Sequence, residues 1–133
     1  MVVEPIKDKI KIKQLYYYLN GKNPKYGLLF KFGLNTGLRI SDILPIKVKD
    51  IFNERGEYRY YLILKEKKTG KIKKIKLNNA IKKAINSFVK QQELTQDSYL
   101  FYSRKGGHLK RIQAYKVLKE AANICYVEKF WHT

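Results

Sequence analysis

The segment Asn35-Thr36-Gly37-Leu38-Arg39-Ile40-Ser41-Asp42 closes an almost wholly apolar stretch with a glycine turn and an arginine. The 133-residue chain carries 29 Lys and Arg against 11 Asp and Glu, a formal net charge of +18. A guanidinium stays charged at any working pH, and its planar fork can hold two phosphate oxygens at once. An arginine at the edge of a core, in so basic a chain, predicts a phosphate contact at Arg39.

The residues on both sides of this segment predict a mainly helical domain. Apolar spacing indicates helices over 7–19, 24–35, 41–46, 79–91 and 111–124. The 24–35 helix should lie in the centre of the core, because only Lys25 and Lys31 interrupt its apolar character. Asp42 follows Arg39 by one helical turn and is expected to orient its side chain.

The hydrophobic period changes after Ile46. The stretches 48–52, 58–64 and 71–77 predict three short strands of an antiparallel meander, with turns at 53–56 and at Thr69-Gly70. At 44% hydrophobic residues, without a linker, the chain should form one α+β domain over 1–133. Helices should dominate this domain, with one small three-stranded sheet.

The composition favours a nucleic-acid partner, although RNA or an anionic membrane surface would also suit a basic chain. Cys125 is the single cysteine of the sequence, so no intrachain disulfide is expected. With only His108 and His132 as further metal ligands of the zinc-binding type, neither a metal nor a cofactor is expected. No apolar run reaches about 18 residues, and the amino terminus lacks the pattern of a signal peptide. A cytoplasmic protein without membrane contact is therefore expected.

Arg39 with Ser41 and Asp42 resembles the first active-site arginine motif of the tyrosine recombinases, the phage integrase family of DNA breaking and rejoining enzymes. The resemblance implies a catalytic-domain fold, double-stranded DNA as the partner and Arg39 as a ligand of the scissile phosphate. It also implies a tyrosine that attacks this phosphate and forms a 3′-phosphotyrosyl link.

Seven lysines crowd residues 65–76 around the Thr69-Gly70 turn. A solvated ribbon that faces DNA explains most of them, including Lys65, Lys67, Lys71 and Lys73. The string Lys68-Thr69-Gly70-Lys71 resembles the mobile hairpin of the family, in which a lysine near the turn protonates the leaving 5′-hydroxyl. By this resemblance Lys68 is the candidate general acid, a role that contributes about 10²–10⁴ in rate.

The family also uses a His-x-x-Arg motif, and two places in this chain resemble parts of it. His108-Leu109-Lys110-Arg111 fits the letters but precedes the helix that the motif should follow, so Arg111 is interpreted as a phosphate or groove contact. His132 fits the position, and Trp131-His132-Thr133 resembles the beginning of the motif. The candidate catalytic residues are therefore Arg39, Lys68 and His132, with Asp42 in support.

In the family the second arginine and the nucleophilic tyrosine follow the histidine, whereas all eleven tyrosines here precede His132. Those at 16–18 and 58–61 are expected to pack. The expectation is a truncated recombinase that binds DNA but cannot cleave it alone, and that self-associates through an uncovered carboxy-terminal face. One inserted nucleotide would turn Phe-Gly-Thr-His into the observed Phe130-Trp131-His132-Thr133. The alternative is a non-enzymatic basic module that binds nucleic acid, with Arg39 merely paired to Asp42.

Overall fold

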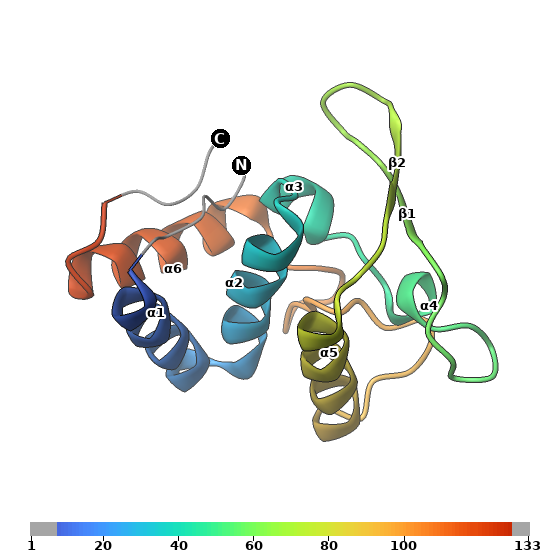
Figure 1. Cartoon of the computed structure of the whole chain (residues 1–133), viewed down its shortest axis with the longest axis horizontal. Coiled ribbons are helices and arrows are strands. Elements are labelled where there is room, and N and C mark those ends of the chain that lie inside the picture. The colour runs from blue at the N-terminus through green and yellow to red at the C-terminus, as the bar shows by residue number, and fades with distance from the viewer. Residues whose placement is uncertain (1–7, 129–133) are drawn as a thin grey trace.

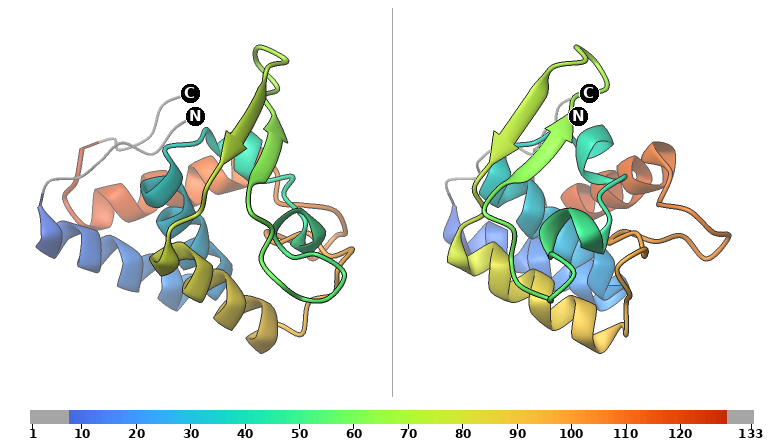
Figure 2. Two further views of the ribbon diagram at one scale, coloured as in Figure 1. Left: turned by 45° about the vertical axis from the view of Figure 1, so that its right-hand side comes forward. Right: turned by 90° about the vertical axis from the view of Figure 1, so that its right-hand side faces the viewer.

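The computed structural model describes residues 8–128, which form six helices and one β-hairpin (Figure 1). In chain order the elements are α1 (Lys9–Lys22), α2 (Pro24–Thr36), α3 (Ile40–Ile43), α4 (Val48–Ile51), β1 (Leu62–Lys65), β2 (Ile72–Ile75), α5 (Asn79–Gln91) and α6 (Arg111–Ile124). Helix α2 stands in the middle, with α1 and α6 on one side and α5 on the other. The hairpin rises away from this helical body in every view (Figure 2).

Helix α2 is the centre of the core, as predicted. Its apolar side chains are buried around most of its circumference, among them Leu28, Leu29, Phe30 and Phe32. Asn23 caps its start, because the Asn23 side chain accepts the backbone N–H of Lys25 at 3.1 Å. Gly37 ends it in the left-handed conformation at φ +67°, a geometry that favours glycine. The chain thereby turns directly into Arg39.

Helices α1 and α5 pack against α2, and α6 packs against α1, with the faces that their spacing predicts. Leu15 and Leu19 of α1 are fully buried, as are Ile85 of α5 and Leu118 of α6. Ile10 is the exception, because it lies in the first turn of α1 with 68% of its surface exposed. A polar cluster also joins two helices. The Tyr18 hydroxyl donates to Glu120 at 2.5 Å. The Lys22 ammonium lies 2.5 Å from the same carboxylate.

The predicted three-stranded meander is wrong, because the described residues form a two-stranded antiparallel sheet. Its register pairs Leu62 with Ile75 and Lys65 with Ile72. The stretch predicted as the first strand is instead the helical turn α4. The Asp50 carboxylate stabilises that turn by accepting the Lys47 N–H at 2.8 Å. Strand character survives only at Phe52, which forms an isolated bridge with Tyr58.

The prediction that the tyrosines pack is also partly wrong. Tyr17 and Tyr60 are each 69% exposed, and Tyr61 is exposed as well. Tyr60 and Tyr61 contact one another instead of the core, with ring centroids 4.6 Å apart, because their segment does not join the sheet. Tyr58 does pack, since its ring centroid lies 4.8 Å from that of Phe52 and its hydroxyl donates to the Lys82 carbonyl at 2.8 Å.

The segment from α5 to α6 crosses back beneath the hairpin and anchors the start of α6. Leu100 and Phe101 are fully buried, and the Leu100 N–H donates to the Ile46 carbonyl at 3.0 Å. The Leu109 N–H donates to the Phe101 carbonyl at 2.8 Å, which closes the loop that leads into α6. Within residues 8–128, no helix combines the length and the apolar character that a bilayer crossing requires.

Candidate functional site

Arg39 stands at the junction between the core helix α2 and the short helix α3. It is half-buried and occupies the N-cap position of α3, where its carbonyl accepts the N–H groups of Asp42 at 2.9 Å and Ile43 at 3.1 Å. Its neighbours Leu38 and Ile40 are buried, at 2% and 0% exposure. The core therefore fixes the backbone of Arg39 on both sides, which is the support that a phosphate ligand requires.

Asp42 connects two parts of the chain. One is the arginine segment, residues 38–43, and the other is the lysine hairpin, which consists of β1, β2 and the loop between them. Its carboxylate is 6% exposed and accepts the backbone N–H of Lys67 at 3.1 Å, across 25 residues of sequence. The sequence predicts Asp42 as a support for Arg39, and the structure shows in addition that its carboxylate contacts the hairpin. The sequence predicts Lys67 as a DNA contact but not the role of its backbone N–H as a donor to Asp42, because a pattern of side chains carries no signal for a backbone donor.

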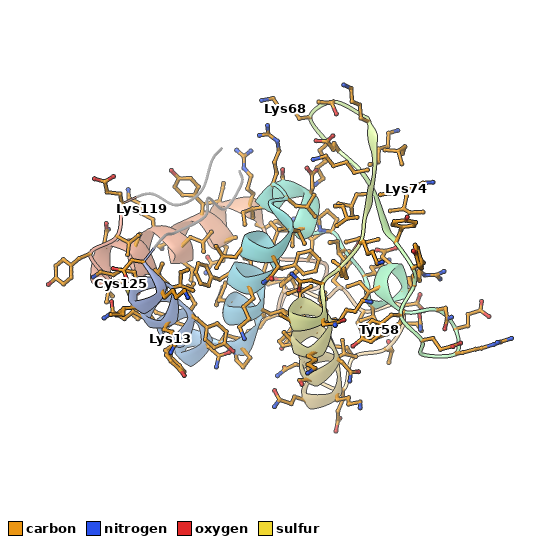
Figure 3. All side chains as sticks on the ribbon, in the orientation of Figure 1. Lys13, Tyr58, Lys68, Lys74, Lys119 and Cys125 are labelled. Carbon is orange, nitrogen blue, oxygen red and sulfur yellow. The ribbon has the colours of Figure 1, made fainter. Side chains whose placement is uncertain are left out.

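The hairpin presents Lys68 at its tip. The loop is closed by two backbone hydrogen bonds, from the Glu66 N–H to the Lys71 carbonyl at 2.9 Å and from the Gly70 N–H to the Glu66 carbonyl at 2.8 Å. Figure 3 shows Lys68 at the end of the ribbon, with its side chain directed away from β2 toward the side on which α3 lies. Since the Lys67 N–H donates a hydrogen bond to Asp42, the backbone next to Lys68 is held close to the arginine segment.

A small cavity separates the hairpin from α3 and α4. Its volume is about 180 Å³, and its lining includes Ser41 and Asp42 from one side and Lys65 and Lys67 from the other. Ile63 and Leu64 of β1 complete this wall. The arginine segment and the tip of the hairpin therefore face each other across this cavity, while Leu62 and Leu64 of β1 belong to the same core as Leu38 and Ile40.

The remaining predicted DNA contacts are exposed cations. Lys65, Lys67, Lys71 and Lys73 all lie at the surface of the ribbon, and Arg111 is exposed at the start of α6. Glu66 is the single acidic residue in 65–76, and its carboxylate lies 4.0 Å from the Lys73 ammonium. The ribbon consequently keeps a strongly positive surface, whose attraction to phosphates is reduced by salt.

His108 has contacts that suit a loop residue. Its Nδ1 lies 2.7 Å from the Leu109 carbonyl, an acceptor only, so Nδ1 carries the proton and donates. The imidazole also meets the Tyr99 ring edge to face, with centroids 5.4 Å apart. His132, the other candidate, lies outside the described residues.

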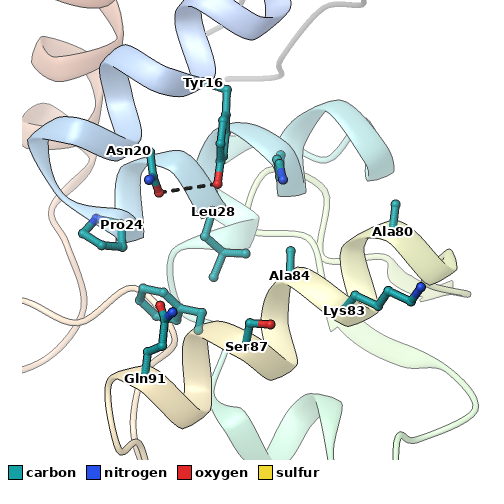
Figure 4. Close-up of a pocket in the computed structure, with 11 residues that line it drawn as sticks. Tyr16, Asn20, Pro24, Leu28, Ala80, Lys83, Ala84, Ser87 and Gln91 are labelled. Carbon is teal, nitrogen blue, oxygen red and sulfur yellow. Dashed lines mark hydrogen bonds between the residues drawn. The ribbon is translucent and has the colours of Figure 1, made fainter.

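A larger cavity, of about 400 Å³, lies between α1, α2 and α5 (Figure 4). The Tyr16 hydroxyl donates to Asn20 at 3.5 Å within it, and the Lys31 ammonium lies 4.2 Å from the centroid of the Tyr16 ring. Its lining holds no carboxylate, thiol or imidazole and none of the residues predicted to contact DNA. In the described part of the chain, no group of three or more His, Cys, Asp or Glu side chains is arranged to hold a metal ion.

Comparison with known proteins places this geometry in a family. The sequence model of the phage integrase family matches residues 8–133. The chain belongs to the phage integrase family. This phage integrase family member is 40% identical over 129 residues to the probable integrase/recombinase YoeC of Bacillus subtilis (strain 168), a match that covers 96% of the chain and 67% of the relative.

Solved structures show the same fold at lower sequence identity. XerA recombinase matches with a TM-score of 0.69 at 14% identity over 98% of the chain, and lambda integrase bound to DNA with 0.71 at 16% identity over 98%. The chain spans 46% of the length of each of these two structures. The predicted relationship to the tyrosine recombinases and the predicted mixed, mainly helical fold are confirmed, apart from the third strand.

Proposed function

We propose that this integrase-family chain forms part of a site-specific recombinase, binds double-stranded DNA and holds the scissile phosphate at Arg39. The observation that carries the proposal is the hydrogen bond from the Lys67 N–H to Asp42, at 3.1 Å. It joins two elements that are distant in sequence, the arginine motif and the lysine hairpin, into one phosphate-facing unit. A basic module with scattered charges would not need this link.

Arg39 is the proposed phosphate clamp. Its guanidinium offers two parallel N–H donors to two non-bridging oxygens, and such charge-assisted pairs are roughly twice as strong as neutral hydrogen bonds. Charge grows on these oxygens as the phosphoryl group is attacked, so a fixed cation stabilises the transition state more than the ground state. The buried neighbours Leu38 and Ile40 hold the backbone from which this cation projects.

Lys68 is the proposed general acid. Departure of the 5′-oxygen leaves a strongly basic alkoxide, and an ammonium at the hairpin tip can protonate it as the P–O bond breaks. The bond between Asp42 and Lys67 limits the arc through which the tip moves, because it holds the residue next to Lys68. His132 stays the candidate for the histidine of the family, as a proposal from sequence alone.

The nucleophile is not assigned to a described tyrosine. The hydroxyls of Tyr18, Tyr58 and Tyr102 donate to Glu120, to the Lys82 carbonyl and to Gln92, respectively. These three hydroxyls thus have hydrogen-bond partners within the fold, which favours a structural role for them. In the family the nucleophilic tyrosine follows the histidine, whereas every tyrosine of this chain precedes His132, so none of them is proposed as the nucleophile.

Duplex DNA and a second copy of the protein are the proposed partners. The exposed ribbon lysines Lys65, Lys67, Lys71 and Lys73, together with Arg111, would contact phosphates on either side of the scissile one. Lambda integrase, which shares the fold, has been solved as a dimer bound to a core site and as a tetramer bound to a Holliday junction. We infer that the present protein also associates on DNA.

A covalent-trap assay tests the recombinase function. The complete gene product, and not residues 1–133 alone, is incubated with labelled, nicked duplexes of random sequence, and the DNA that stays attached to protein after denaturation is measured. Trapping is expected for the wild type, with a loss of about 10²-fold or more for Arg39→Ala and for Lys68→Ala. Lys90→Ala, which removes an exposed lysine of α5, serves as the matched control and should trap normally.

The assay also separates the two functions that the sequence left open. DNA binding without any trapped product in the complete gene product would contradict the recombinase proposal and favour the non-enzymatic basic module, whereas residues 1–133 alone are expected to bind DNA without trapping. Equal trapping by Lys68→Ala and Lys90→Ala would contradict the role of Lys68 alone.

A further inference from the structure

A second cavity, remote from the hairpin, is lined by positive charge. It has a volume of about 450 Å³ and lies between the start of α2, the loop 103–107 and the start of α6. Five basic side chains line it: Lys22, Lys25, Arg104, Lys105 and Lys110. Its lining contains no carboxylate, although the Lys22 ammonium reaches Glu120 outside the cavity. Such a concentration of one sign of charge favours an anionic ligand.

Lys25 is the unusual member of this group, because it is only 5% exposed. Its ammonium donates to the Tyr102 carbonyl at 3.0 Å and lies 4.8 Å from the centroid of the Tyr102 ring. Within residues 8–128 it has no carboxylate partner, and one carbonyl satisfies only one of its three donors. Burial and, less strongly, the nearby charge of Arg104 lower the pKa of Lys25. The negative charge of an anion in the cavity would oppose this lowering of the pKa.

Two long helices begin at the same cavity. Asn23, Lys25 and Tyr26 form the start of α2, and Lys110 and Gln113 belong to the first turn of α6. Lys110 is the N-cap of α6, and a lysine side chain cannot accept the first-turn N–H groups that an N-cap normally satisfies. These N–H groups and the positive ends of both helix dipoles add to the cationic side chains.

We infer that this cavity is a second phosphate-binding site, independent of the one proposed at Arg39. The two sites lie at opposite ends of α2, whose 13 residues separate them by about 20 Å at the helical rise. One phosphate group therefore cannot occupy both. The ligand chemistry is a phosphate group with several acceptor oxygens, carried by free phosphate or by the backbone of nucleic acid.

Nuclear magnetic resonance with inorganic phosphate as the probe tests this site. The backbone amides of Lys25, of residues 103–107 and of residues 110–113 should shift together in the uniformly ¹⁵N-labelled chain. The double variant Arg104→Gln/Lys105→Gln should weaken phosphate binding at least about tenfold, since each charged contact contributes more than a neutral one. Both side chains are exposed, so the fold should persist.

The matched control is Lys9→Gln/Lys13→Gln, which removes two exposed lysines of α1 and the same charge. It should change the dissociation constant less than twofold. Equal weakening by both double variants, or phosphate-induced shifts spread evenly over the lysine-rich surface, would overturn the inference. Lys25→Met gives a second test, because phosphate should raise the melting temperature of the wild type by more than that of this variant, whatever the stability of the variant itself.

A titration with a short DNA duplex distinguishes the two sources of phosphate. Shifts at the same amides with DNA, lost in Arg104→Gln/Lys105→Gln, would assign the site to a nucleic-acid backbone. Shifts with free phosphate only would assign it to a small ligand, and shifts with neither would overturn the site. Arg39→Lys should leave all of these amide shifts unchanged, so the result does not depend on the proposed function.

Discussion

At the scale of the residue, the proposed function depends on a cation whose backbone is held by apolar neighbours. Arg39 lies between Leu38 and Ile40, which are buried, and follows Gly37, whose positive φ ends α2. A lysine at position 39 would keep the charge and lose the two-pronged geometry. Replacing Arg39 by lysine therefore separates the contribution of the charge from that of the two-pronged geometry.

Arg39→Lys should weaken binding to duplex DNA about tenfold, because one charge-assisted hydrogen bond contributes about 1.5–3 kcal/mol. Fluorescence anisotropy with a labelled duplex measures the affinity, and circular dichroism checks the fold. Arg55→Lys, at an exposed turn, is the matched control and should bind as the wild type does. An unchanged affinity for Arg39→Lys would show that its guanidinium does not contact phosphate.

The residue scale was also the most readable from sequence. Residue type, spacing and resemblance to the family motifs single out Arg39 and the lysines of 65–76 as candidates, and the structure confirms that Gly37 ends its helix. The contact between Asp42 and Lys67 was not predictable, because it joins a side chain to a backbone N–H across 25 residues. Nor was the burial of Lys25, since a charged residue in the first turn of a helix is ordinarily exposed.

At the scale of the element, long helices were predicted well and short strands poorly. Each long helix contains enough turns to repeat its apolar face, as at Ile81, Ile85 and Phe88 in α5. The stretch 48–52 has only five residues, which is too short for periodicity to separate a strand from a helical turn. There the hydrogen bond from Lys47 to Asp50 decides for the turn. The sequence pattern did predict the hairpin, because Gly70 supplies the positive φ of its tip.

Asp50→Ala should reduce the free energy of unfolding by about 1 kcal/mol, since it removes the carboxylate that accepts the Lys47 N–H at the start of α4. Urea denaturation measures this change. Asp97→Ala removes the same charge from an exposed pair, 3.5 Å from Lys49, and should cost less than about 0.5 kcal/mol. Equal effects of the two variants would indicate that net charge, and not the hydrogen bond, stabilises this turn.

Asp42→Ala should release the hairpin from the arginine segment. The amide hydrogen of Lys67 should then exchange about 10–100-fold faster, as expected for a lost hydrogen bond to a carboxylate of about 1.5–3 kcal/mol. Asp42→Asn keeps an acceptor oxygen in the same place and should retain most of the protection. Hydrogen exchange followed by nuclear magnetic resonance measures the exchange rate of the Lys67 amide in both variants. If the Lys67 amide exchanges as slowly in Asp42→Ala as in the wild type, this bond does not hold the hairpin.

At the scale of the whole molecule, a strongly basic hairpin projects from a helical body (Figure 2). The chain as a whole has a formal net charge of +18. The class of fold followed from the order of the elements and from the resemblance of the arginine motif. The position of the ribbon relative to α3 depends on long-range packing, which local periodicity does not report. Charge at this scale predicts how strongly the protein binds DNA more than which sequence it selects.

Binding of duplex DNA should fall steeply with salt and depend little on sequence. If about six phosphates are neutralised, the affinity should drop about 10³-fold between 50 and 200 mM salt. Titrations with two duplexes of unrelated sequence, over a series of salt concentrations, measure this slope. A flat dependence on salt would show that the ribbon lysines do not displace counterions.

The most direct measurement of the central claim maps where DNA touches the protein. A ¹⁵N-labelled chain is titrated with a short duplex, and the amide shifts are assigned along the backbone. The proposed interface predicts coincident shifts in residues 38–43 and 65–73, with both sets lost together in Arg39→Ala/Lys68→Ala and kept in Lys90→Ala. Shifts that leave residues 38–43 unchanged while the hairpin responds would contradict the claim that Arg39 and the lysine hairpin form one phosphate-binding unit.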